Sequence, residues 1–524
     1  MLLWMRIGAF LLILLPSAWF AWQWRDMPAA GYYHDDGLYF VAAQSLAESG
    51  EYKISSLPAQ PPQTKYPPLW PLVLSLAWHI NPIYPQNLPW AMLLAWIWLP
   101  ATVLLYCRWL RQTGAEEKII WLLAALWALN PYVILFSTTL LTEMFFTSLL
   151  LATLLLLRRP QPGWTAIAGL LAGLAFLVRS AGLVLLPAVV AWLVLRKQPR
   201  RATIFASVLA PIMAAWFWWA GTHRTPGSDE ITLYYTNYFG YHLSVFSWNE
   251  LPMYLWRNAE ALVSGLGAFL LPSNTTSLLD RVLALTLGVA GISGVLRRLR
   301  QDPTGSLAPY AYFSALYILM LIVWHFPPNE RFAMPVAPLW FLGIFSEFTH
   351  ILGTIHKAFQ KPDFGQKIAG AVIVLLLLST LGWCASRQFS LVTSDLPVFF
   401  SSQSRRFHDS EPTIRYIREN LPADATILAE MDPTLFLRSG RRAAGYILNT
   451  VHWYRGDEDA RAAAYSDAAQ YCKRLGIRYV LLNQWDFSRD LTPEAHDTIL
   501  RRLPADPRLE LVYSSGPSAL YRIR

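Results

Sequence analysis

Long apolar runs alternate with short loops rich in Lys and Arg through the first 385 residues of the chain. Runs of this kind, repeated many times in one chain, predict membrane-spanning helices. The pattern therefore predicts an α-helical polytopic membrane protein with about eleven transmembrane helices. The predicted segments are 7–22, 88–105, 119–136, 140–157, 164–178, 183–195, 204–221, 282–295, 310–325, 332–345 and 368–384.

The basic residues between these segments predict the orientation of the chain. If Arg6 is cytoplasmic, every later basic cluster falls on the cytoplasmic side, as the positive-inside rule expects. Two large loops, 25–87 and 223–280, are then outside the cytoplasm. Residues 67–80 within the first loop are apolar but short and start with two prolines, which indicates a re-entrant or interfacial helix. The basic clusters lie at 108–111, 158–159, 196–201, 297–300 and 357–361.

The tail beyond residue 385 has a different pattern. It is charged, and helical periodicity alternates with short β-branched and aromatic runs. We expect two domains: a transmembrane domain, 1–385, and an extracytoplasmic α/β domain, 386–524. In the second domain we expect helices at 411–419 and 458–475, and strands at 426–429, 479–482, 509–512 and 519–523. It carries no phosphate-binding glycine loop and no metal-ligand spacing, so the sequence assigns it no chemistry.

Composition supports the membrane class and excludes others. The chain has 524 residues, of which 54% are hydrophobic and 15% charged, against about 25% charged in soluble proteins. The net charge of +9 resides in loops beside apolar segments, so it predicts contact with membrane lipids and no nucleic-acid partner. Trp, Gln and Arg follow the first apolar segment, which predicts an uncleaved anchor. The three cysteines, Cys107, Cys384 and Cys472, are too dispersed to predict a metal site or a disulfide.

The stretch Tyr-Tyr-His-Asp-Asp-Gly-Leu-Tyr, residues 32–39, follows the first segment and opens a predicted helix over 35–48. On a helical wheel, Asp35 falls in the middle of the apolar face and Asp36 nearer its edge. A carboxylate directed at protein or lipid beside a membrane segment is costly and therefore indicates function. The alternative is that Asp35 only caps the helix N-terminus.

Four more charged residues fall on the predicted outer side, where membrane proteins carry few cations. Lys65 precedes the re-entrant helix, and Glu143 lies early in the fourth segment. Arg179 ends the fifth segment, and Arg331 precedes the tenth. Each alone could be an interfacial side chain or a bundle hydrogen bond. Together with Asp35 and Asp36, they predict a site for an anionic substrate, with carboxylates for acid–base chemistry or for a metal ion.

These motifs resemble the GT-C membrane glycosyltransferases. The resemblance covers roughly residues 1–350. It lies in the Asp35-Asp36 pair, the Glu-Ser-Gly end of the helix, Lys65-Tyr66-Pro-Pro-Leu, Glu143 and the Arg331-Phe-x-x-Pro-x-x-Pro run. It is strongest to the protein O-mannosyltransferases and the lipid A aminoarabinose transferase. It implies a bacterial inner-membrane enzyme that moves a sugar from a polyprenyl-phosphate donor to a lipid, glycan or protein acceptor on the outer side.

The resemblance also implies residue roles. Asp35 matches the catalytic acidic residue and Asp36 its neighbour. Lys65 matches the lysine that contacts the donor phosphate, and we place Arg331 and Arg179 with it. Glu143 matches the second acidic position and is the candidate ligand for a divalent metal ion, the only cofactor considered. His34 and Tyr39 flank the pair as further candidates. The pair is Asp-Asp here, where Asp-Glu is commoner, and Tyr66 separates Lys65 from the prolines.

The residues support this chemistry directly. A sugar on a lipid phosphate is already activated, which fits a sequence without a nucleotide-binding loop. The acceptor hydroxyl needs a general base, here Asp35, and the departing phosphate needs positive charge. A single displacement inverts the anomeric centre. One alternative is a transporter with Glu143 and Arg179 as its ion site, which predicts an internal repeat that the sequence lacks. Another is a non-catalytic envelope-assembly or flippase partner, which would not require Asp35.

Overall fold

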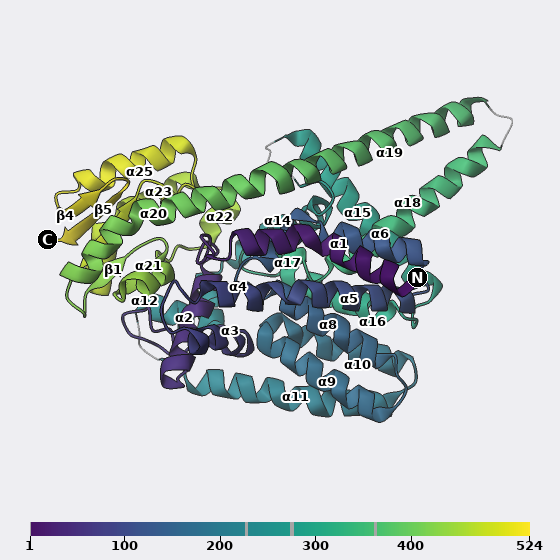
Figure 1. The fold of residues 1–524 in the computed structure, drawn as a ribbon, viewed down its shortest axis with the longest axis horizontal. Helices are drawn as coiled ribbons and strands as arrows, with labels where there is room; N and C mark the ends of the chain where they lie inside the picture. Colours follow the sequence, from purple (N-terminus) through teal and green to yellow (C-terminus); the bar gives the residue numbers. More distant parts are fainter. Residues whose placement is uncertain (1, 226–228, 273–276, 361–363) are drawn as a thin grey trace.

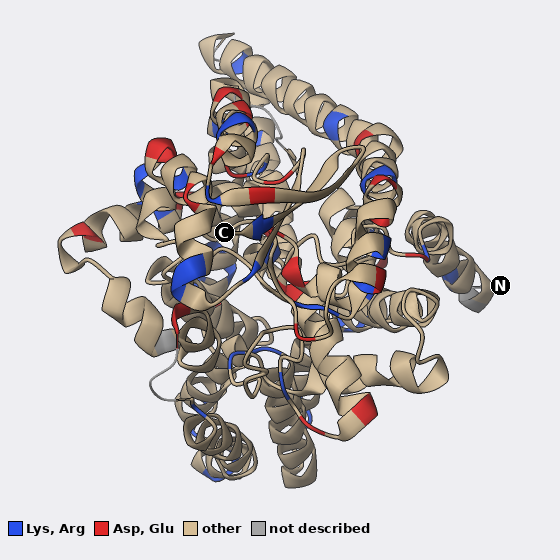
Figure 2. Ribbon diagram, turned by 90° about the vertical axis from the view of Figure 1, so that its left-hand side faces the viewer, with Lys and Arg blue, Asp and Glu red and all other residues tan. Residues whose placement is uncertain are grey.

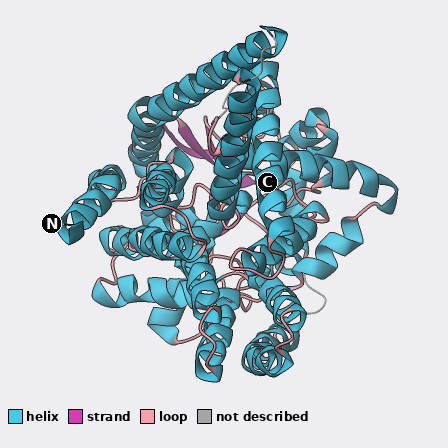
Figure 3. Cartoon of the chain, turned by 90° about the vertical axis from the view of Figure 1, so that its right-hand side faces the viewer, coloured by secondary structure: helices cyan, strands magenta, loops and turns pink. Residues whose placement is uncertain are grey.

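Helices make up most of the chain, and the strands are confined to one small sheet (Figure 3). The computed structural model describes residues 2–225, 229–272, 277–360 and 364–524. The elements up to residue 420 are α1 (Leu2–Gln23), α2 (Asp35–Ser49), α3 (Leu69–Ile80), α4 (Leu88–Trp96), α5 (Trp98–Gln112), α6 (Glu117–Ala128), α7 (Pro131–Ser137), α8 (Glu143–Leu157), α9 (Pro162–Val178), η1 (Ser180–Val184), α10 (Leu185–Leu195), α11 (Pro199–Thr222), α12 (Glu230–Thr236), α13 (Tyr238–Val245), η2 (Trp248–Glu250), α14 (Leu251–Ala268), α15 (Leu278–Gln301), α16 (Ala308–Ile322), α17 (Glu330–Ala333), α18 (Ala337–Phe359), α19 (Phe364–Ser390), η3 (Leu391–Asp395) and α20 (Leu396–Asn420).

All eleven predicted apolar segments coincide with a helix or with two closely spaced helices. Among the described residues, five helices are long and apolar enough to cross a membrane, or six if the bent pair α6–α7 forms one span. Other apolar helices, such as α8, α9 and α16, are shorter. The chain is thus a multi-pass membrane protein, and the number of about eleven spans stays a prediction.

Outward-facing apolar side chains and tight internal contacts both fit a membrane environment. Charged residues are sparse along the long helices (Figure 2), and α19 exposes Leu375, Leu376 and Leu378 at 61–66%. Inside, α15 and α18 approach closely because glycines face each other. A Cβ at Gly294 would lie 2.0 Å from the carbonyl oxygen of Gly343, so no larger residue fits there.

The second large loop contains a helix that the apolar pattern did not predict. Helix α14 packs along α15, and polar residues such as Asn258 interrupt its apolar face. Asn258 is buried and donates to the carbonyl oxygens of Ile322 (3.0 Å) and Trp324 (2.8 Å). It also accepts a hydrogen bond from Tyr454 of the C-terminal domain at 2.9 Å. This loop therefore joins the bundle to that domain.

The C-terminal domain is built on a five-stranded sheet of order β2-β1-β3-β5-β4. Strand β1 is parallel to β2 and β3, whereas β5 is antiparallel to β3 and β4. The four predicted strands are present, and β2, whose sequence Arg-Ala-Ala lacks the β-branched and aromatic residues typical of strands, was not predicted. The predicted helix over 458–475 is two helices. The elements are β1 (Thr426–Leu428), α21 (Asp432–Ser439), β2 (Arg442–Ala444), α22 (Val451–Arg455), α23 (Glu458–Ser466), α24 (Ala468–Leu475), β3 (Tyr479–Asn483), α25 (Pro493–Ala505), β4 (Leu509–Ser515) and β5 (Ser518–Ile523).

A long helical stretch connects the two parts. Helices α19 and α20 are joined by a single π-helical turn, η3, and run as one element over 364–420. Figure 1 shows this element passing from the end of the bundle at α18 to the sheet. The predicted domain boundary at 385 falls inside it. The C-terminal domain also contacts α2 through α21, so it covers the first large loop.

Candidate active site

A tight loop, residues 24–34, leads from α1 into α2. Asp36 accepts hydrogen bonds from the backbone N–H groups of Gly31 (2.8 Å) and Tyr33 (3.1 Å), and is completely buried. Gly31 has φ +87°, and a Cβ there would lie 1.9 Å from Oγ1 of Thr434 in α21. Only glycine fits this position. Asp36 therefore fixes the loop that presents the preceding residue, Asp35.

Asp35 is the first residue of α2, and its side chain is 27% exposed. The helical wheel placed Asp35 deepest and Asp36 at the edge; this detail is wrong, because Asp36 is the fully buried member. The reason is that the C-terminal domain covers a second face of α2. A Cβ at Gly37 would lie 2.9 Å from the Cβ of Pro433 in α21. Of the two carboxylates, Asp35 is the accessible one.

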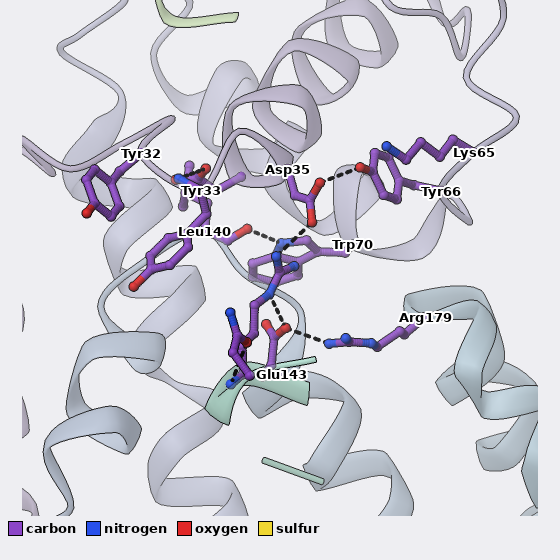
Figure 4. A network of polar contacts seen from close by, with 12 residues as sticks. Tyr32, Tyr33, Asp35, Lys65, Tyr66, Trp70, Leu140, Glu143 and Arg179 are labelled. Carbon is purple, nitrogen blue, oxygen red and sulfur yellow. Dashed lines mark hydrogen bonds and ion pairs between the residues drawn. The ribbon is translucent and has the colours of Figure 1, made fainter. Parts of the chain in front are cut away.

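Arg331 connects Asp35 to a buried carboxylate in the bundle. Its Nη1 donates to Asp35 Oδ2 at 2.7 Å, and its Nε donates to Glu143 Oε1 at 2.5 Å. Arg179 donates to the same oxygen of Glu143 at 2.5 Å (Figure 4). Glu143 is completely buried at the start of α8, and its Oε2 has no hydrogen-bond partner among the described residues. The result is a chain of alternating charge that joins α2, α17, α8 and the end of α9.

Lys65 lies among four tyrosine rings on the other side of Asp35. Its Nζ donates to Tyr234 Oη at 3.1 Å. Tyr66, the next residue, donates through Oη to Asp35 Oδ1 (Figure 4). An ammonium group over aromatic faces is stabilised by their electron density. The ring centroids lie 4.2–5.3 Å from Nζ and belong to Tyr66, Tyr234, Tyr235 and Tyr238.

Two stacked histidines extend this aromatic cluster. The rings of His242 and His325 have centroids 3.5 Å apart, and Tyr238 Oη lies 2.6 Å from His325 Nε2. Burial, with a smaller contribution from the Lys65 charge, lowers the pKa of His242 to about 3. Both ring nitrogens of His242 lack a partner within the described ranges. The pair is neutral at physiological pH and leaves Lys65 as the cation of this cluster.

Three cations and three carboxylates, one of them Asp36, lie in or beside the site. Lys65, Arg179 and Arg331 face two carboxylates, Asp35 and Glu143. Burial raises the pKa of Asp35, but the charges of Arg331 and Lys65 and the Tyr66 hydrogen bond outweigh it and hold this pKa well below its usual range. Asp35 is therefore ionised at any physiological pH. Both arginines are paired with carboxylates, so Lys65 is the cation that can meet an anion.

The pKa of Asp36 is shifted upward, opposite to that of Asp35. Burial raises its pKa to about 6, although the backbone N–H groups of Gly31 and Gly37 and the Arg331 charge act against that change. The neighbouring charge of Asp35 adds to the rise. The two adjacent carboxyl groups thus have pKa values pushed apart by their surroundings, and Asp35 is the one suited to act as a carboxylate.

The C-terminal domain braces the loop in front of α2. Asp432, completely buried at the start of α21, lies 2.8 Å from Nε2 of His34. Thr434 Oγ1 donates to the carbonyl oxygen of Ala30 at 3.2 Å. Burial lowers the pKa of His34, but the Asp432 carboxylate outweighs this and raises it overall. His34 therefore faces the C-terminal domain, while Asp35 faces the bundle.

A divalent metal ion at this site stays a prediction, because arginines already hold the carboxylates of the site. Asp35 and Glu143 are both occupied by guanidinium groups of Arg331 or Arg179. Across residues 2–225, 229–272, 277–360 and 364–524, no three His, Cys, Asp or Glu side chains are grouped as metal ligands. Glu143, the predicted metal ligand, holds two arginines. No chemical step at this site is therefore assigned to a metal.

The structure brings most predicted residues together. Asp35, Glu143, Arg179 and Arg331 form one network, with Lys65 beside it. Tyr39 is buried with its ring 4.9 Å from that of Tyr66, so it packs behind the site. Asp36 and His34 hold the loop. The sequence analysis missed Tyr66, Asp432 and the tyrosines of α12 and α13. Tyr66 was noted only as an insertion, and the run Leu-Tyr-Tyr-Thr-Asn-Tyr, 233–238, was an unused signal.

Comparison with known proteins identifies the fold. Neither family models nor curated proteins match the chain. Among solved structures, ArnT from Cupriavidus metallidurans bound to undecaprenyl phosphate has a TM-score of 0.50 at 13% identity, over 93% of each chain. The apo Archaeoglobus fulgidus oligosaccharyltransferase has a TM-score of 0.54 at 12% identity, over 96% of this chain and 73% of that chain. The chain has the GT-C fold. Another structure of that oligosaccharyltransferase, a complex with Zn and sulfate, has a TM-score of 0.52 at 13% identity, over 92% of this chain and 68% of that chain.

The GT-C fold accounts for the arrangement of the site. The sequence motifs that resemble GT-C enzymes lie within residues 1–350. The likeness to solved structures extends over most of the chain, including the C-terminal domain. The membrane helices and the loops between them bring α2, α8 and α17 to one place, although these elements are far apart in sequence.

Proposed function

We propose that this protein is a glycosyltransferase that moves a sugar from a polyprenyl-phosphate donor to a hydroxyl acceptor on the extracytoplasmic side of a bacterial inner membrane. The observation that supports it most is the setting of Asp35: a partly exposed carboxylate, held by Arg331 and Tyr66 and close to Lys65, on a GT-C fold. One similar structure, ArnT, holds undecaprenyl phosphate, which favours a donor of that class.

Asp35 is the proposed general base. An ionised carboxylate has about four acceptor positions, and Tyr66 and Arg331 occupy two. The remaining positions are free to accept the proton of an acceptor hydroxyl as it attacks the anomeric carbon. Asp36 cannot fill this role, because it is fully buried and already accepts from two backbone N–H groups. We assign Asp36 to positioning the loop.

Lys65 is the proposed partner of the donor phosphate. Its ammonium group donates to a tyrosine hydroxyl and forms no ion pair with a carboxylate in the described part of the chain. Charge placed where the phosphate develops its own negative charge lowers the barrier to departure. Arg331 and Arg179 contribute to the same field while holding Glu143. A single displacement by the acceptor would invert the configuration at the anomeric carbon.

The proposal is tested with the purified full-length chain and a panel of undecaprenyl-phosphate sugars. Transfer or slow hydrolysis of one donor, with an inverted anomer in the product, is expected. Failure to consume any donor would refute the proposed activity and favour the transporter or the non-catalytic assembly partner. If transfer is observed, mass spectrometry of envelope lipids and glycans from a deletion strain would identify the acceptor, because the product missing from that strain is the acceptor that carries the sugar.

A further inference from the structure

A second cavity lies away from Asp35, between α20 and the loop after β3. Its volume is about 400 Å³, within the range of pockets that bind small ligands. Arg405, Arg406 and Asp409 line it from α20, and Gln484 and Trp485 line it from the loop. It combines an aromatic ring, hydrogen-bonding groups and two adjacent cations in one hollow.

The two arginines of this cavity have no carboxylate partner in the part of the chain that the structure describes. Within the described residues, neither Arg405 nor Arg406 forms an ion pair, and Arg406 lies over the ring of Trp485 at 5.7 Å. Seven other arginines of the domain each pair with a carboxylate, whereas Arg415 and Arg441, for example, do not in the described chain. The paired ones are Arg418, Arg438, Arg455, Arg474, Arg478, Arg508 and Arg522. Arginine is suited to two-point contact with phosphate and carboxylate groups. These two guanidinium groups are therefore free to meet an anion from outside the chain.

The cavity is connected to the loop that carries Asp35. A narrower cavity shares Arg406 and Trp485 with it and extends to Met27, Pro28 and Ala30 of that loop. Arg489, four residues after Trp485, donates to the carbonyl oxygen of Tyr32 at 2.7 Å. A ligand in the large cavity would thus lie at the seam where the C-terminal domain covers the loop.

We propose that this cavity binds an anionic sugar, phosphorylated or carboxylated, as part of the acceptor. The inference rests on the proposed function, since it names a partner for the same reaction. The indole of Trp485 offers an apolar face for a sugar ring, and Arg405 and Arg406 offer charge for its anionic group. The single phosphate of the donor is already matched by Lys65, so the cavity with Arg405 and Arg406 suits another ligand.

Binding is measured first, without turnover. Glucose 1-phosphate, glucuronate, neutral glucose and inorganic phosphate are titrated into the full-length protein in detergent by calorimetry at low salt. The anionic sugars are expected to bind at least about tenfold more tightly than glucose or phosphate alone, because both the ring and the charge contribute. Arg406→Ala should weaken this binding about tenfold, and exposed Arg405→Ala about threefold. Arg415→Ala is the matched control, an exposed arginine of α20 outside the cavity, and should change nothing.

The outcomes separate this inference from the proposed activity. Equal affinity in wild type and Arg406→Ala overturns the inference. The inference is also overturned if inorganic phosphate binds as tightly as the sugar phosphate. It is overturned as well if phosphatidylglycerol nanodiscs bind in an Arg406-dependent way while anionic sugars do not bind. If the wild-type protein transfers sugar, Arg406→Ala should raise the KM for the acceptor and leave the KM for the donor unchanged. An unchanged acceptor KM overturns the inference and leaves the glycosyltransferase proposal intact. Arg406-dependent sugar binding in a chain that transfers nothing refutes the activity alone.

Discussion

Replacement of Asp35 by Asn tests the proposed mechanism most directly, because it keeps the shape of the side chain and removes its basicity. Asp35 accepts from Arg331 and Tyr66 in the structure, and an amide can still accept from one of them. General-base catalysis is typically worth about 10²- to 10⁴-fold. Turnover of Asp35→Asn should therefore fall by at least about two orders of magnitude.

The expected loss of stability is much smaller. Removing one partner of a buried ion pair can cost about 3–5 kcal/mol, because it leaves an unpaired charge. Arg331 keeps Glu143 as a partner at 2.5 Å, and Asp35 is partly exposed. We therefore expect a loss of about 1–3 kcal/mol, the value of one charged hydrogen bond. The variant should remain folded in detergent.

The assay compares sugar transfer from an undecaprenyl-phosphate donor with thermal unfolding of the same preparations. Asp36→Asn is the matched control, since it makes the same chemical change one residue later, at a carboxyl group that accepts from the backbone N–H groups of Gly31 and Tyr33. It should lower turnover less than Asp35→Asn. Near wild-type turnover for Asp35→Asn would refute the assignment of the base. An unfolded Asp35→Asn would give Asp35 a structural role instead.

Three further substitutions and one fusion test the rest of the site. Arg331→Lys keeps the charge but cannot contact both Asp35 and Glu143, so kcat/KM for the donor should fall about 10- to 100-fold. The acid limb of the pH–rate profile should move to higher pH, because the pKa of Asp35 rises. Unchanged kinetics would contradict a role for Arg331 in linking the two carboxylates. Burial raises the pKa of Asp36 to about 6, so folding favours its protonated form. The free energy of unfolding should therefore fall by on the order of 3 kcal/mol as pH rises from about 4 to about 6, and then level off. Thermal unfolding of Asp36→Asn should not show this pH dependence. The raised pKa of His34 beside Asp432 predicts a stabilisation that is complete below a pH of about 6.5 and is lost as pH rises through the pKa of the folded state. The melting-temperature difference between wild type and Asp432→Asn should therefore shrink at alkaline pH. A difference that stays constant with pH would exclude titration of His34 as the cause of the stabilisation. A reporter active only in the cytoplasm, fused after Arg524, should be silent, and activity there would overturn the proposed topology.

Much of the fold could be predicted from the sequence because lipid imposes a simple rule on the chain. Apolar runs must satisfy their backbone groups internally, so each one forms helix, and basic residues mark the loops between them. The rule failed where a helix is bounded by protein rather than lipid. Helix α14 carries the buried Asn258, whose partners are Ile322 and Trp324. Such polar positions interrupt the apolar pattern and hide the helix.

The charged residues of the site could be predicted because charge at the edge of an apolar segment is rare and costly. Asp35, Lys65, Glu143, Arg179 and Arg331 were all found in this way. Their pairing could not be predicted, because it depends on how distant elements approach. Arg331 lies 188 residues from Glu143 and 296 from Asp35 in the sequence, and nothing local relates these positions.

The relative burial of Asp35 and Asp36 shows the limit of a helical wheel. The wheel treats α2 as a helix with one covered face, whereas two surfaces cover it. The bundle covers one face, and α21 covers another, where Pro433 approaches Gly37. Asp36 lies under this second cover and binds the loop, which leaves Asp35 to the bundle side and its arginine. The C-terminal domain, to which the sequence assigned no chemistry, therefore determines which of the two carboxylates is accessible.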